Sequence, residues 1–300
     1  MEVPVFHDAV APERSRRFDS RGIRLQLHEW GDPAGPPLVL CHGMFDHGRG
    51  FDRLAPRLAE RFRVVALDAR GHGDSDWAES YTWPADLADV VNVARSLGRP
   101  VRLVGHSKGG GQATDAAILA GALVRQVVNI DGFGPPPGGH RRFAAEGTTP
   151  ERFAAYLDRR RAAAEQRAWR TYASLDELVE RRRQQNPRLS REWLRYFVYH
   201  GARQVEGGWR WKVDPHASHG FGPWRPEWIG PSFQQLHAPM LAVVGSESDT
   251  WGPLPEEILA PRLAFVPRLE RAVVRGAGHF VHMERPAETA ELLLAFLETR

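Results

Sequence analysis

The 300-residue sequence has little of several things, and each shortage excludes a class of protein. It contains one cysteine, Cys41, which excludes an internal disulfide and any zinc site built from several cysteines. Its apolar runs are far shorter than the roughly 20 residues that a membrane-spanning helix needs. The first residues contain an early acid and two prolines without a continuous apolar run, so we expect no signal peptide, no membrane partner and a cytoplasmic location.

Lysine is scarce as well. Lys108 and Lys212 are the only lysines, so nearly all of the 40 basic residues are arginines, balanced by 37 acids to a formal charge of +3. The densest arginine runs, at 158–170 and 180–188, are interleaved with acids, glutamines and alanines, which is typical of a solvated helix face. There is no helix-turn-helix pattern or basic stripe, so we expect no nucleic-acid partner.

What is present is a regular alternation of apolar strands with helix-like segments. Continuous apolar runs at 36–43, 62–71, 101–107 and 124–132 end on glycine or polar residues, as strands of a parallel sheet covered on both faces do. Helical patterns lie between them, and the same alternation returns after residue 237. This order predicts an α/β protein with a doubly wound, mostly parallel sheet. The segment IRLQLHEW (23–30) alternates with period two and predicts a hairpin at the sheet edge.

The segment 134–236 has a different texture. It begins with a proline- and glycine-rich stretch, continues with helical patterns and ends in a tryptophan-rich stretch broken by prolines. It lacks the strand–helix alternation. We therefore predict a core formed by residues 1–133 and 237–300, with residues 134–236 as a helical lid inserted after the sixth strand.

Ser107 stands in the pattern G-x-S-x-G, in the stretch LVGHSKGGG. The pattern follows an apolar strand directly and opens a helix, which is the context of a nucleophile elbow. A sharp turn of this kind brings backbone segments very close, so glycines two residues on either side avoid clashes. We therefore predict that Ser107 is a nucleophile.

A serine hydroxyl needs a base within hydrogen-bond reach. His279 lies in a glycine-rich loop just after the last predicted strand, and the carboxyl ends of parallel strands share one edge of a sheet, so His279 and Ser107 are expected to meet there. The oxyanion of an acyl transfer needs two N–H donors. We predict the backbone N–H of Lys108, directly after the serine, and that of Met44, after the third strand.

Four stretches carry a resemblance to a known family: HGMFDH, DARGHGDSDW, GHSKGG and GAGHFVHMERP, in family order and spacing. The chain resembles the lid-bearing serine hydrolases of the α/β-hydrolase superfamily over roughly residues 25–133 and 237–300. The resemblance implies an eight-stranded core, the elbow serine, the late histidine and hydrolysis without a cofactor or a metal. The fold alone does not fix the substrate.

Two carboxylates are candidates for the third member of the triad. Asp249 follows the seventh predicted strand, the usual position of the acid in the family, and we favour it. Asp131 ends the sixth strand, where relatives similar to haloalkane dehalogenases and some lactone hydrolases carry theirs. Either one is able to orient an imidazole and stabilise its cation.

Lys108 departs from the family pattern, which usually has an apolar side chain after the serine. Its ammonium has two interpretations: it binds a carboxylate of the substrate, or it pairs with an acid such as Asp131 or Asp249. Aromatic side chains crowd one part of the predicted lid and indicate a hydrophobic substrate. The residues that we expect in the pocket wall are His42, His106, Trp209, Trp211 and Trp224.

These patterns predict a serine hydrolase that cleaves a carboxylic ester of a mainly hydrophobic small molecule through an acyl-enzyme. The alternatives within the same fold are hydrolysis of a lactone, of a thioester or of a carbon–carbon bond in a diketone. An alternative of another class is a ligand-sensing protein that keeps the pocket without turnover. The oligomeric state and the natural substrate have no signature in the sequence.

Overall fold

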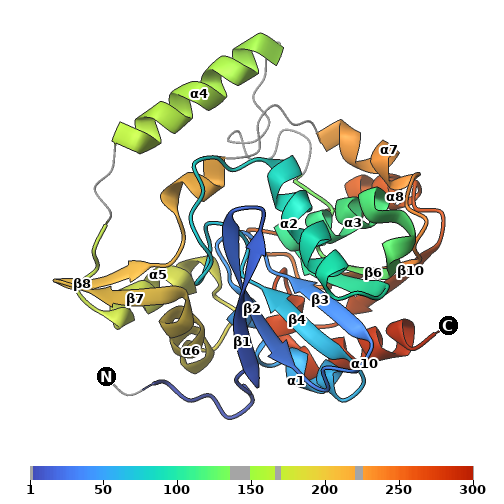
Figure 1. The fold of residues 1–300 in the computed structure, drawn as a ribbon, viewed down its shortest axis with the longest axis horizontal. Helices are drawn as coiled ribbons and strands as arrows, with labels where there is room; N and C mark the ends of the chain where they lie inside the picture. The colour runs from blue at the N-terminus through green and yellow to red at the C-terminus, as the bar shows by residue number, and fades with distance from the viewer. Residues whose placement is uncertain (1–2, 136–148, 166–169, 220–225, 300) are drawn as a thin grey trace.

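The computed structural model describes residues 3–135, 149–165, 170–219 and 226–299. Its centre is an eight-stranded sheet in the order β1-β2-β4-β3-β5-β6-β9-β10 (Figure 1). The first strand pairs antiparallel with the second, and the second with the fourth, while all other pairs are parallel. The strands are β1 Arg14–Ser20, β2 Ile23–Trp30, β3 Pro37–Cys41, β4 Arg63–Leu67, β5 Val101–His106, β6 Val124–Ile130, β9 Met240–Gly245 and β10 Leu269–Val274. The predicted α/β sheet and its edge hairpin are confirmed.

Helices cover both faces of the sheet, because neighbouring residues of each buried strand point to opposite sides. Leu103 of β5 packs into a cluster with α2, α3 and α8, whereas Val104 packs into a second cluster with α1 and α10. These helices are α1 Ala55–Ala59, α2 Trp83–Ser96, α3 Lys108–Ala120, α8 Glu256–Leu263 and α10 Pro286–Leu297, with the short α9 Val281–Glu284 before the last. Cys41 is buried in this core, and burial raises the pKa of its thiol to about 12, so the thiol is protonated at neutral pH.

The described chain between β6 and β9 contains α4 Thr149–Glu165, α5 Leu175–Gln185, α6 Arg191–Gly201, the hairpin of β7 Ala202–Val205 and β8 Gly208–Trp211, and α7 Ile229–Phe233. Phe233 of α7 packs into the core cluster of α2, α3 and α8. Side chains of α5, α6 and the hairpin form a third apolar cluster, which also includes Phe280 and Met283 from the core. Figure 1 shows α4 at the outer end of this insertion.

The β7–β8 hairpin corrects the expectation that the segment 134–236 is helical. The helix stops at Gly201, and Gly207 and Gly208 have φ of +78° and +143°, values that suit a tight turn between two strands.

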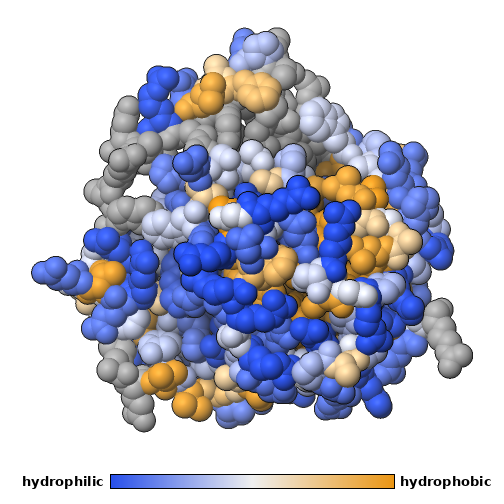
Figure 2. Space-filling view, in the orientation of Figure 1, coloured by the Kyte–Doolittle hydropathy of each residue, from blue (hydrophilic) through white to orange (hydrophobic). Residues whose placement is uncertain are grey.

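The edge of the sheet formed by β1 is polar. The edge strand β1 carries Arg14, Arg16 and Arg17, and the surface over it in Figure 2 is hydrophilic. Charged side chains on an edge strand discourage pairing with other chains. No helix in the described part of the chain has the length and apolar character that crossing a bilayer requires.

Candidate active site

Ser107 lies on the turn that joins β5 to α3. Its backbone has φ of +53° and ψ of −119°, a conformation that costs a non-glycine residue of the order of 1–3 kcal/mol and is found mostly at functional sites. Its N–H donates to the carbonyl of Ile130 at 2.9 Å, which ties the turn to the neighbouring strand β6. The serine lines a pocket at the carboxyl edge of the sheet, beside His279.

The glycines around Ser107 are required by close backbone contacts. A Cβ atom at Gly105 would lie 2.0 Å from the carbonyl oxygen of Gly109, and a Cβ atom at Gly109 would lie 2.2 Å from that of Cys41. No side chain fits at such distances. The glycine pattern that singled out Ser107 in the sequence therefore has the steric cause that an elbow requires.

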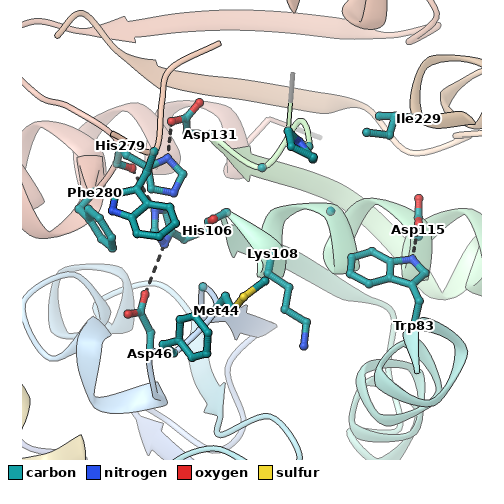
Figure 3. A pocket seen from close by; sticks show the side chains of 18 of the residues that line it. Met44, Asp46, Trp83, His106, Lys108, Asp115, Asp131, Ile229, His279 and Phe280 are labelled. Atoms are coloured by element: carbon teal, nitrogen blue, oxygen red, sulfur yellow. Dashed lines mark hydrogen bonds and ion pairs between the residues drawn. The ribbon is translucent and has the colours of Figure 1, made fainter. Parts of the chain in front are cut away.

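His279 and Asp131 come together at the carboxyl edge of the sheet. His279 follows β10 and Asp131 follows β6, and the Nδ1 atom of His279 lies 2.5 Å from Oδ2 of Asp131 (Figure 3). Both residues are less than a tenth exposed, and both line the pocket beside Ser107. Asp131 has a φ of +48°, a second strained non-glycine backbone in the same site.

The carboxylate of Asp249 takes a different place from the one that the sequence favoured. Its Oδ2 accepts the backbone N–H of His279 at 2.9 Å, and its Oδ1 accepts the N–H groups of Trp251 and Gly252 at 2.7 and 3.2 Å. These bonds hold the loop after β9 against the loop of His279. The imidazole itself faces Asp131, because the loop after β9 folds back on itself, with the N–H of Asp249 donating to the carbonyl of Gly252 at 2.8 Å.

The two residues predicted to supply the oxyanion donors both border the pocket. Met44 and Lys108 line the pocket, and Lys108 begins α3, where N–H groups have no acceptor within the helix. The chain around Met44 is a tight turn: the N–H of Asp46 donates to the carbonyl of Gly43 at 3.2 Å, and Phe45 has a φ of +63°.

The side chain of Lys108 is held by an acid that the sequence did not single out. Its Nζ lies 2.7 Å from Oδ2 of Asp86 in α2, and both side chains are buried. Gln112 donates to the same oxygen at 3.0 Å. An ion pair was one of the two interpretations of Lys108, but its partner is Asp86 rather than Asp131 or Asp249, since α2 lies beside the first turns of α3.

A network of buried polar side chains lies behind the pocket. The Nε2 of His106 lies 2.9 Å from the carbonyl oxygen of His279, and its Nδ1 lies 3.7 Å from Oδ2 of Asp46. Asp46 pairs with Arg182 of α5, which also donates to the carbonyl of Phe45 at 3.3 Å. Burial alone would raise the pKa of Asp46, but the Arg182 guanidinium holds that pKa well below its usual value. These contacts connect the insertion, the turn at Met44, the turn at Ser107 and the loop that carries His279.

The pocket has a volume of about 380 Å³ and a largely apolar wall. Its aromatic side chains differ from those that the sequence predicted. Those that line it are Phe45, Trp83, Trp228, Phe233, Trp251 and Phe280.

Trp209 and Trp211 belong to the apolar cluster of the insertion and do not line this pocket, because the β7–β8 hairpin turns them toward α5 and α6. Trp224 lies outside the described residues.

His106 lines the pocket as expected, but His42 does not. The His42 ring is buried behind the wall, where its Nδ1 lies 2.7 Å from the carbonyl of Gly43 and its Nε2 accepts the N–H of Ala69 at 2.9 Å. Burial lowers the pKa of His42. Its role is to fix the turn after β3.

Sequence reasoning missed Asp46, Asp86, Arg182 and Gly252. Asp46 carried a signal, since it is an acid inside the HGMFDH stretch, whereas Arg182 looked like one more arginine of a solvated helix. Within the described ranges, no group of three or more His, Cys, Asp or Glu side chains is arranged to hold a metal ion.

Comparison with known proteins identifies the family to which the chain is similar. Residues 38–292 match the alpha/beta hydrolase family. The chain is similar to 3-hydroxybutyrate-oligomer hydrolase of Cupriavidus necator, with 29% identity over 89% of this chain and 90% of the relative. It is also similar to 2-(acetamidomethylene)succinate hydrolase of Mesorhizobium japonicum, with 29% identity over 95% of each chain. A crystal structure of E-2-(acetamidomethylene)succinate hydrolase superimposes with a TM-score of 0.76 and 28% identity, covering 95% of this chain and 99% of the other.

Proposed function

The chain belongs to the alpha/beta hydrolase family and is a hydrolase, and from that premise we propose that it is a serine hydrolase of carboxylic esters that works through an acyl-enzyme. One observation carries the proposal: Ser107, on its strained turn, lines the same pocket as the buried His279–Asp131 pair. A nucleophile, a base and a group that orients the base are the three parts that serine catalysis needs.

In the first half of the reaction, the hydroxyl oxygen of Ser107 attacks the ester carbonyl while Nε2 of His279 takes its proton. Asp131 accepts the Nδ1–H of the same ring, which fixes the tautomer and stabilises the imidazolium. The negative charge moves to the carbonyl oxygen, where the N–H groups of Met44 and Lys108 donate to it. The tetrahedral intermediate then expels the alcohol, which takes the proton from His279 and leaves the acyl group on Ser107.

In the second half, water replaces the alcohol. His279 takes a proton from the water as its oxygen attacks the acyl carbonyl, and the same proton returns to Ser107 when the carboxylic acid leaves. The net change is one water consumed, with an acid and an alcohol released.

The insertion at 134–236 serves as the lid of this pocket. Arg182, Gln185 and Asn186 at the end of α5 line the pocket from one side, and Trp228 and Ile229 line it from another. The apolar wall supports a mainly hydrophobic substrate, because small-molecule sites bury most of a ligand against such surfaces.

Activity assays test the proposal directly. We expect the protein to hydrolyse p-nitrophenyl esters, and Ser107→Ala to lose that activity while keeping its melting temperature. A panel of lactones, thioesters and diketones of matched size ranks the other bond types, and faster turnover of any of these would replace the ester. Ligand-induced thermal stabilisation with no turnover of any of them would favour a sensor instead.

A further inference from the structure

The wall of the pocket opposite the proposed triad carries a polar pair without a role in the chemistry above. Trp83 of α2 and Asp115 of α3 both line the pocket, and Nε1 of Trp83 donates to Oδ2 of Asp115 at 2.7 Å. Figure 3 shows this pair on one side, with His279 and Asp131 on the other and Ile229 nearby.

Asp115 lies on the same helix face as the nucleophile. Ser107 immediately precedes α3, and Gly111 and Asp115 follow at intervals of four residues, so the three share one face. With a rise of about 1.5 Å per residue, Asp115 lies about 12 Å along the helix from Ser107. Gly111, between them, also lines the pocket, and a Cβ atom there would already lie 3.3 Å from the ring of Trp83. The missing side chain leaves a path along α3 from the serine to the carboxylate.

The carboxylate of Asp115 is short of partners for its charge. Burial raises its pKa, which the hydrogen bond from Trp83 only partly offsets. Lys108, on the first turn of the same helix, is paired with Asp86, and Asp115 forms no ion pair with any of the described residues. A half-buried carboxylate at the end of an apolar passage favours a ligand group that donates a hydrogen bond, since unmatched buried charge is costly.

We propose that Asp115, held by Trp83, forms a subsite for a hydrogen-bond donor, a hydroxyl or an amine, that the substrate carries at the end of the pocket about two turns of α3 from Ser107. The inference rests on the proposed function and narrows its substrate class. The substrate is then an elongated ester with an apolar middle and a donor at its far end, rather than a uniformly hydrophobic one.

The test uses p-nitrophenyl esters of linear acids that end in a methyl, a hydroxyl or an ammonium group, at a length that reaches Asp115 and at half that length. For the long esters we expect kcat/KM to be about 10- to 100-fold higher with either donor than with methyl, the gain typical of a hydrogen bond to a charged group. The short esters are expected to show no such preference. Equal rates for all three long esters would overturn the subsite while leaving ester hydrolysis intact.

Variants of Asp115 test whether its carboxylate causes the preference for long esters that end in a donor. Asp115→Asn keeps an acceptor for Trp83 and lowers the preference for ammonium more than that for hydroxyl, whereas Asp115→Leu brings both ratios to about one. Asp32→Asn, on an exposed turn, serves as the matched control and keeps the wild-type ratios. A ratio that survives in Asp115→Leu contradicts the inference.

A binding measurement separates this inference from the proposed function. Ser107→Ala protein is titrated with the same long esters in a calorimeter, with tighter binding expected for the two donors than for methyl. If the wild type hydrolyses no ester but Ser107→Ala still shows this order of affinities, the proposed function is wrong and the donor subsite stands. Equal affinities would overturn the subsite, whatever the wild type hydrolyses.

Discussion

The Nδ1 atom of His279 lies 2.5 Å from Oδ2 of Asp131, and both side chains are buried at the carboxyl edge of the sheet. The two residues are 148 positions apart in the chain and meet because β6 and β10 both pair with β9. Asp249 reaches only the backbone of His279. From these contacts we infer different tasks for the two aspartates: Asp131 orients the ring, and Asp249 fixes the loop that carries it.

Asparagine substitutions distinguish these tasks. Asp131→Asn removes the acceptor that selects the tautomer of His279, and we expect kcat to fall about 10⁴-fold, as in the corresponding serine-protease variant. Asp249→Asn retains an acceptor oxygen for the loop, and we expect a loss of about tenfold or less, within the range of a single hydrogen bond. Steady-state kinetics on one p-nitrophenyl ester measures both. The reverse ranking would return the role to Asp249.

Gly252 is expected to be a positioning residue. A Cβ atom there would lie 2.3 Å from Oδ2 of Asp131 and 3.0 Å from Nδ1 of His279. Gly252→Ala therefore pushes the pair apart, and we expect kcat to fall about 100-fold, the size of effect that a displacement of about 1 Å produces.

Gly98→Ala is the control for that substitution. Gly98 has a φ of +68° and open space around it, so alanine strains the backbone at a distance from the pocket. Its melting temperature should fall while kcat holds. If Gly252→Ala and Gly98→Ala have equal kcat, Gly252 has no positioning role.

The ion pair between Arg182 and Asp46 predicts a large effect on stability. Arg182→Met leaves the buried Asp46 carboxylate without its guanidinium, and we expect the free energy of unfolding to fall by about 3–5 kcal/mol. The double variant Arg182→Met/Asp46→Asn removes the unpaired charge and should regain part of that loss. Urea unfolding measures each variant. Additive losses in the double variant would contradict a coupled pair.

Buried histidines predict destabilisation by acid. Burial lowers the pKa of His47 from its usual 6.5 to about 3, and its Nε2 lies 2.9 Å from the carbonyl oxygen of Phe197. Between these two pKa values the unfolded chain binds a proton that the folded protein excludes. The free energy of unfolding therefore falls as the pH drops through this range, by up to about 1.4 kcal/mol per pH unit for this residue.

The variant His47→Gln has no such proton to bind. Its free energy of unfolding should depend less steeply on pH between 6.5 and 3 than that of the wild type, a difference that urea titrations at several pH values detect. Parallel pH curves for the two proteins would show that His47 is protonated in the folded state as easily as in the unfolded one.

The parts of the site that depend on local sequence were predictable, and those that depend on packing were not. Ser107 was readable because strand, glycines and helix follow one another within a few residues. The choice between Asp131 and Asp249 was not, since both follow strands that end at the same edge and only the fold of the loops decides which one faces the ring. The same holds for Arg182, whose helical neighbours are solvated while its own side chain is buried against Asp46.

The tryptophans illustrate the same limit. Their crowding in the sequence indicated an aromatic surface, but the β7–β8 hairpin directs Trp209 into the insertion's own core. Trp228 from the same stretch does line the pocket, together with Trp83 from α2 and Trp251 from the loop after β9. Sequence proximity shows that aromatic side chains will be buried together and does not tell which cavity they enter.

The most direct test of the whole account is to treat the protein with a fluorophosphonate probe and locate the modified residue by mass spectrometry. We expect one adduct per chain, on Ser107, lost in Ser107→Ala and strongly slowed in His279→Ala, because only a serine activated by its base attacks the probe. An unmodified protein, or an adduct that persists in Ser107→Ala, would contradict the account.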